Sequence, residues 1–150
     1  MKKLFAAALA SSLMALSGIA LASVPASQIA LGGIAPGISV DSVKQAYGEP
    51  SYSYDRERLT FSNGLVVKVD DDRPGVVEEV LVQSGSLGTP AGISVGMGAD
   101  RLNSAYGTAD KVDADRDEVE YVYYSEDRTK QLEFEVRGGV IVKISCELND

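Results

Sequence analysis

The 150-residue chain contains no histidine, no tryptophan and a single cysteine. Without histidine it lacks the commonest general base and the commonest zinc ligand of proteins. With Cys146 alone it cannot form an internal disulfide, so packing must hold the fold together. We therefore expect no catalytic site, no cofactor and no zinc centre. Cys146 alternates with Val142 and Ile144, which predicts a buried position in the core.

Basic residues are also scarce. The chain has 14 Lys and Arg residues against 22 Asp and Glu residues, for a net charge of −8. An acidic surface repels nucleic acids and anionic lipids, so we expect neither as a partner. An envelope or extracellular protein is the kind of partner that this charge allows.

Residues 1–22 have the pattern of a cleaved signal peptide. Lys2 and Lys3 precede an apolar, alanine-rich run that ends in Ala20-Leu21-Ala22, a small-x-small cleavage pattern. The alternative, a transmembrane anchor, is disfavoured because the run is short and contains serines and a glycine. We expect cleavage after Ala22 and export to the periplasm or beyond. Residue 23, directly after the cleavage point, is a serine and not a cysteine, so no lipid anchor is expected there.

A 16-residue segment occurs twice, at residues 33–48 and 92–107. The copies are 59 positions apart, and each ends in Ala-Tyr-Gly. Apolar residues recur at helical spacing in both, and Gly48 and Gly107 are suited to end a helix. Each copy therefore predicts a short helix that must lie on a partner surface, because a helix of this length is not stable alone.

Segments with the period-2 alternation of half-buried strands follow each helix. They predict an α+β fold of two tandem units, residues 23–86 and 87–150, each a helix plus a three-stranded antiparallel sheet. The two units share a core, with the helices on one face of the sheet. Residues 51–57 and 110–118 are interpreted as charged loops. The alternating segments are residues 58–61, 65–70, 76–83, 119–124, 131–137 and 140–146.

The second copy resembles a known type of exported module. Its Gly-Met pair at 96–97, followed by Leu102 and Tyr106-Gly107, is similar to the helix of outer-membrane assembly lipoproteins of the SmpA/OmlA type and of tandem-repeat β-lactamase inhibitory proteins. The strands at 121–124 and 132–140 match in position. This resemblance implies binding through the outer sheet face and the loops. The missing lipidated cysteine and disulfides mean that neither family's specific role is implied.

The polar face and the loops carry the candidate partner-binding residues. Three tyrosines are free to face outward, and tyrosine is favoured at binding surfaces. One valine shares a side with the last of them, and two glutamates lie on the polar face of an expected strand. The predicted partner-binding residues are Tyr52, Tyr54, Tyr124, Val122, Glu133 and Glu135.

Three other interpretations stay open. Glu133 and Glu135 lie about 7 Å apart on a strand, a spacing that would suit a small hydrolase that uses only carboxylates. The alternating acids of 113–118 or the run Asp70-Asp71-Asp72 suggest weak calcium binding, although 113–118 lacks the glycine and glutamate of an EF-hand loop. A structural envelope spacer without a ligand is the third. The leading prediction is an exported, non-catalytic binding module of unknown oligomeric state.

Overall fold

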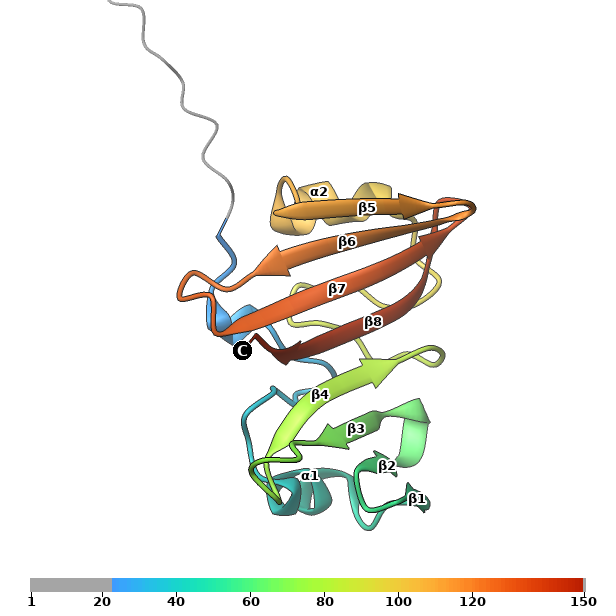
Figure 1. The fold of residues 1–150 in the computed structure, drawn as a ribbon. Helices are drawn as coiled ribbons and strands as arrows, with labels where there is room; N and C mark the ends of the chain where they lie inside the picture. The colour runs from blue at the N-terminus through green and yellow to red at the C-terminus, as the bar shows by residue number, and fades with distance from the viewer. Residues whose placement is uncertain (1–22, 150) are drawn as a thin grey trace, which may run out of the picture.

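The computed structural model describes residues 23–149 (Figure 1). The expected signal peptide, residues 1–22, lies outside the described residues. Within the described part of the chain, no helix is long and apolar enough to span a membrane.

The described residues contain two short α-helices, two 3-10 turns and eight strands (Figure 1). A helix followed by four strands occurs first in the N-terminal half and then again in the C-terminal half. The elements are η1 (Ala26–Gln28), α1 (Val40–Tyr47), β1 (Tyr52–Tyr54), β2 (Arg58–Thr60), η2 (Ser62–Gly64), β3 (Val66–Val69), β4 (Val77–Val82), α2 (Asp100–Tyr106), β5 (Lys111–Asp115), β6 (Glu118–Tyr124), β7 (Lys130–Arg137) and β8 (Val140–Leu148).

Both helices end at the glycine that the sequence indicates. Gly48 and Gly107 have φ values of 80° and 75°, a region open to glycine, and each donates its N–H to a carbonyl of the last turn. At the other end of α1, the Oγ of Ser39 accepts from the N–H of Ser42, a side-chain cap. No side chain caps the start of α2.

All eight strands form one antiparallel sheet in the order β1-β2-β3-β4-β8-β7-β6-β5. The two halves meet where β4 pairs with β8, and we call this pairing the seam. Its register places Val80 opposite Cys146 and Leu81 opposite Ser145. Each half contributes four consecutive strands, and the two ends of the sheet are the short strand β1 and the exposed strand β5.

The predicted fold class is therefore wrong. The protein is mostly one eight-stranded sheet with two short helices, not two units of a helix plus three strands. The missed strands β1 and β5 lie in segments 51–57 and 110–118, which were interpreted as loops. In β5 the acids at positions 113 and 115 alternate with Val112 and Ala114, but all five residues are exposed. Strand β1 is only three residues long and β5 is highly charged, so neither shows a clear period-2 alternation of apolar residues.

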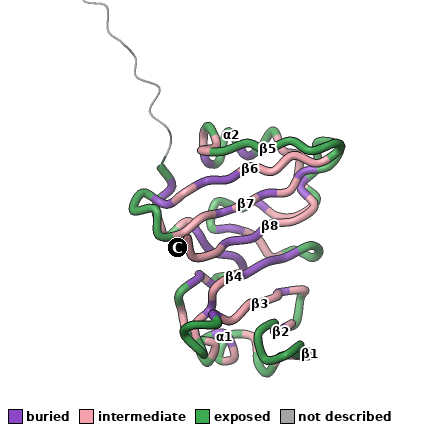
Figure 2. Tube along the Cα trace, viewed as in Figure 1, coloured by how far each residue is buried: buried purple, intermediate pink, exposed green. Residues whose placement is uncertain are grey.

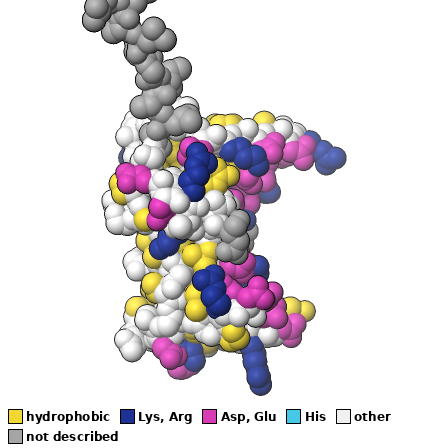
Figure 3. Space-filling view, turned by 60° about the vertical axis from the view of Figure 1, so that its left-hand side comes forward, with side chains coloured by type: hydrophobic (Ala, Val, Ile, Leu, Met, Phe, Trp, Pro, Cys, Tyr) yellow, Lys and Arg dark blue, Asp and Glu magenta, His cyan; other side chains and the backbone are white. Residues whose placement is uncertain are grey.

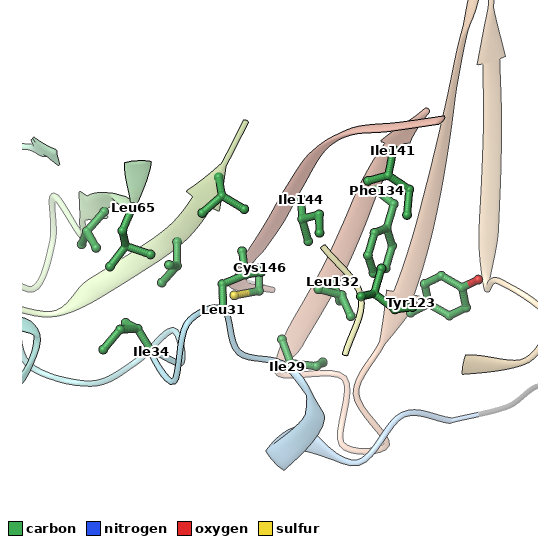
Figure 4. Close-up of a cluster of buried hydrophobic side chains, with 14 of the residues drawn as sticks. Ile29, Leu31, Ile34, Leu65, Tyr123, Leu132, Phe134, Ile141, Ile144 and Cys146 are labelled. Atoms are coloured by element: carbon green, nitrogen blue, oxygen red, sulfur yellow. The ribbon is translucent and has the colours of Figure 1, made fainter. Parts of the chain in front are cut away.

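One face of the sheet carries a hydrophobic core shared by both halves. Figure 2 shows the buried residues concentrated in the central strands, with exposed residues along β1 and β5. In Figure 4, Ile29 and Leu31 of the N-terminal segment lie on the same side of the sheet as Leu132 and Cys146. The helices pack on this face as well, since the ring of Tyr106 from α2 lies 5.6 Å from the ring of Phe134. Within residues 23–149, nothing forms a covering layer on the opposite face.

Cys146 is fully buried at the seam, as the alternation predicts. Burial raises the pKa of its thiol far above the ordinary value, which suppresses the reactive thiolate. We expect the native protein to react with a thiol reagent at least about a hundredfold more slowly than the protein unfolded in urea, because labelling requires opening of the core. Rapid labelling of the native protein, followed by absorbance, would place the thiol at the surface.

Candidate functional site: the concave polar face

The uncovered face of the sheet is polar and hollowed. Figure 3 shows the molecule's outline curving inward on one side, with Asp and Glu side chains gathered along the hollow. We call this surface the concave face. Through the strand registers, one row of side chains crosses it from Tyr52 at one end through Leu81, Ser145 and Glu133 to Val122. A parallel row begins at Tyr54 and, by the same pairings, ends at Tyr124.

The middle of the first row is buried although no layer of the described residues covers it. Leu81, Ser145 and Val122 are only 4%, 2% and 3% exposed. Such burial on an open face arises where curvature brings long neighbouring side chains over short ones. Val122, predicted as a partner contact, lies on the expected face but below its surface, and its role in binding stays a prediction.

Two tyrosines stand out from one end of the face. Tyr52 and Tyr54 belong to the edge strand β1, and their side chains are 62% and 60% exposed. Tyr124 lies six strand spacings away, which at ~4.8 Å per strand is roughly 29 Å along the curved sheet. Its ring is covered by the Arg128 guanidinium, 5.2 Å from the ring centre. The three tyrosines thus flank the hollow from opposite sides.

Between them, two glutamates are joined by one amide. The Nε2 of Gln131 donates to Oε1 of Glu133 at 2.6 Å and also to Oε1 of Glu147. These residues come from the adjacent strands β7 and β8, where Gln131 and Glu147 are directly opposite. One amide group therefore holds two carboxylates close together at the centre of the concave face.

The two carboxylates favour the protonated form more than ordinary glutamates do. Burial is the largest cause, and with the negative charges of Glu147, Glu120 and Glu79 it raises the pKa of Glu133 to about 7. Burial likewise raises the pKa of Glu147, with Glu79 adding to it. Glu133 can therefore hold or release a proton near neutral pH, which is unusual for an acid at a protein surface.

Glu133 and Glu135 do not form the carboxylate pair considered from the sequence. Glu135 instead accepts a hydrogen bond from Lys143 Nζ at 2.6 Å, within an ion pair across β7 and β8. Glu147, Gln131 and Glu79 were missed. Their alternation within each strand places them on the polar face, but the pairing of β8 with both β7 and β4 could not be read from the sequence. Only that pairing brings the three residues together.

The acidic segment at 113–118 spans two strands rather than forming a loop. Asp113 lies opposite Glu120, and Asp115 lies opposite Glu118, in the β5–β6 hairpin. An EF-hand loop wraps its ligands around a single ion, which two extended strands cannot do. Among residues 23–149, no group of three or more acidic or cysteine side chains is arranged to hold a metal ion.

Comparisons with known proteins bear on the fold alone. No family model matches the chain, and no curated protein matches it. Among solved structures, it is similar to the crystal structure of YjgB, a DUF4309 family protein from Bacillus subtilis. The TM-score is 0.53 at 16% sequence identity, and the similarity covers 73% of this chain and 78% of the other. At this identity the likeness extends to the architecture and carries no function.

Proposed function

We propose that this protein is an exported, non-catalytic module that binds another protein through its concave face. The observation that carries the proposal is a hollow, uncovered sheet face with large exposed tyrosines at one end, Tyr52 and Tyr54. The uncovered sheet face can receive a convex surface, and the core shared by both halves packs against its other side. The export proposal rests on the signal-like residues 1–22.

Tyrosines supply most of the contact area in this proposal. Each adds a large, stiff ring with a polar tip, which suits a binding surface. Tyr124 is held by Arg128 and by the pairing of β6, so it loses little freedom when a partner binds. Tyr52 and Tyr54 are on the other side of the hollow, where they would contact the opposite side of the same partner.

The test is capture from envelope extract by immobilised protein. We expect the triple variant Tyr52→Ala/Tyr54→Ala/Tyr124→Ala to bind a captured protein about tenfold more weakly than the wild type, because truncating a central aromatic contact typically costs more than 1 kcal/mol. The matched control removes a tyrosine hydroxyl away from this face, in Tyr47→Phe, whose ring packs near Phe61. Equal capture by all three proteins would mean that Tyr52, Tyr54 and Tyr124 are not part of the binding site. Capture of nothing by any of them favours a structural spacer.

A small carboxylate hydrolase is a second candidate, favoured by one observation. Glu133, with its pKa raised to about 7, lies beside a second carboxylate, Glu147. An acid of this kind and a neighbouring carboxylate are the two parts needed to cleave a glycosidic bond. This candidate predicts that the wild type hydrolyses a cell-wall polysaccharide and that Glu133→Gln does not. Absence of released reducing ends with the wild type would dismiss it.

A further inference from the structure

We propose that the partner inserts a basic side chain, an arginine or a lysine on a protruding loop, between Glu133 and Glu147 at the centre of the concave face. This inference rests on the proposed function and deepens it, since it states the chemistry of the partner's central contact. Four observations support it: the place of the two glutamates, the charges around them, their free oxygens and their affinity for protons.

The two lysines beside the centre of this face are already paired, and the other basic residue of the same row, Arg58 on β2, lies two strand spacings from Glu79. Lys143 forms an ion pair with Glu135 at 2.6 Å, and Lys68 forms one with Glu78 at 2.9 Å. Four carboxylates at the centre have no ion pair among residues 23–149, and we call them the central acidic cluster. Its members are Glu79, Glu120, Glu133 and Glu147. A surface with this excess of negative charge is complementary to a positively charged partner.

The geometry fits a single cation more closely than a diffuse basic surface. The Nε2 of Gln131 donates to Oε1 of Glu133 and to Oε1 of Glu147, which holds the two carboxylates side by side. Within the described residues, no hydrogen bond reaches Oε2 of either glutamate, so both oxygens remain free to accept. A guanidinium group, with its planar set of N–H donors, can donate to both at once.

The hollow shape selects how the basic group arrives. The glutamates lie in the middle of a face that curves inward (Figure 3), flanked by Tyr52 and Tyr54 on one side and by Tyr124 on the other. Leu81 and Ser145 form the floor beneath and are buried. A flat partner surface would contact the tyrosines on the two sides of the hollow before it reached the glutamates. The cation must therefore be carried on a segment that projects into the hollow.

Binding of a cation here must be linked to protons. The charged and titratable groups that face Glu133 are Glu79 and Lys68 from the first half, Lys143 and Glu147 on β8, Glu120 and Tyr124 on β6, and Glu135 on its own strand. Most are acidic, and together with burial they raise its pKa to about 7. A cation seated beside it would lower that pKa and release the proton. Linkage to one such group predicts roughly tenfold weaker binding near pH 6 than near pH 8.

The test uses a hexa-arginine peptide as the probe, followed by calorimetry at low salt in buffers near pH 6 and pH 8. We expect the wild type to bind about tenfold more tightly at the higher pH and to release protons on binding. Glu133→Gln should bind more weakly near pH 8 and lose most of the pH dependence, leaving only the part contributed by Glu147, whose pKa burial also raises. The matched control, Glu126→Gln, removes the same charge from the exposed turn between β6 and β7, outside the central acidic cluster, and should keep both properties.

Equal weakening by Glu126→Gln and Glu133→Gln would show that the peptide senses only net charge, and would overturn the inference. Binding by the wild type that is the same at both pH values would overturn it as well. The outcome is separable from that of the proposed function. If the tyrosine variant loses a captured partner while the peptide shows no preference for Glu133, the binding face stands and the basic contact fails.

Discussion

Phe134→Ala should destabilise the protein by about 3–5 kcal/mol, the usual cost of removing a large buried aromatic ring. Phe134 is fully buried on β7. Its ring lies 5.6 Å from that of Tyr106 and 6.0 Å from that of Tyr123, so alanine would leave a cavity beneath α2 and β6. The measurement is urea unfolding followed by far-UV circular dichroism, with tyrosine fluorescence as the second probe.

The same experiment tests whether the two halves unfold together. The hydrophobic cluster contains Val43 and Leu65 of the first half as well as Phe134 of the second. We therefore expect one transition, shifted to lower urea, by both probes. Val112→Ala on the edge strand is the control, because its side chain is 55% exposed and its loss should cost under about 0.5 kcal/mol. Two separate transitions, or a cost for Phe134→Ala as small as the control's, would contradict a shared core.

Glu133→Gln should stabilise the protein by roughly 1–2 kcal/mol near pH 8. Its pKa is raised in the folded state, from 4.5 to about 7, so ionising it opposes folding. A pKa difference of one unit between the folded and unfolded protein corresponds to about 1.4 kcal/mol. We take about half of the energy that the shift of Glu133 would give, because the side chain is only partly buried and water screens its charge. The glutamine oxygen can still accept the hydrogen bond from Gln131.

The sign of the pH dependence follows from that raised pKa. Below about pH 4.5 Glu133 is protonated in both the folded and the unfolded protein, so it costs nothing. Between about pH 4.5 and 7 the unfolded protein ionises Glu133 while the folded protein keeps it protonated, so the free energy of unfolding falls as the pH rises. The full cost is present above about pH 7. The difference between Glu133→Gln and the wild type should therefore grow from near zero at acidic pH to its full value near pH 8. Thermal unfolding across this range gives the result. A variant less stable than the wild type near pH 8 would mean that the ionised carboxylate is favourably paired.

The sequence predicted the elements whose apolar residues repeat without interruption. Leu132, Phe134 and Val136 alternate with polar residues on β7, and all three are buried. Both helix ends were evident from Gly48 and Gly107 because a glycine after an apolar helical stripe has few other uses. Strands β1 and β5 lie at the edges of the sheet, where one side lacks a neighbour and both faces meet water. Their residues carry little apolar signal, which is why they were interpreted as loops.

The candidate site was accessible to sequence reasoning only one strand at a time. Alternation placed Tyr124 and Glu133 on the polar face, and the registers put both there. The pairing of Glu133 with Glu147 and the proximity of Glu79 depend on β8 lying between β7 and β4. Nothing local to any of these strands specifies that order. The curvature that buries Val122 is likewise a property of the whole sheet.

The seam between β4 and β8 makes the concave face one continuous surface, so it is the feature to test most directly. Nuclear magnetic resonance can measure cross-strand Overhauser contacts between backbone protons of Leu81 and Ser145 and of Val82 and Ile144, which are paired in the sheet. In antiparallel strands the Hα atoms of opposite residues lie close only where the pair is not hydrogen-bonded, so we expect one of these two adjacent pairs to give an Hα–Hα contact as strong as those of the non-hydrogen-bonded pairs between β7 and β8. Strong contacts within each half and none across the seam would mean two separate sheets, with no shared hollow between them.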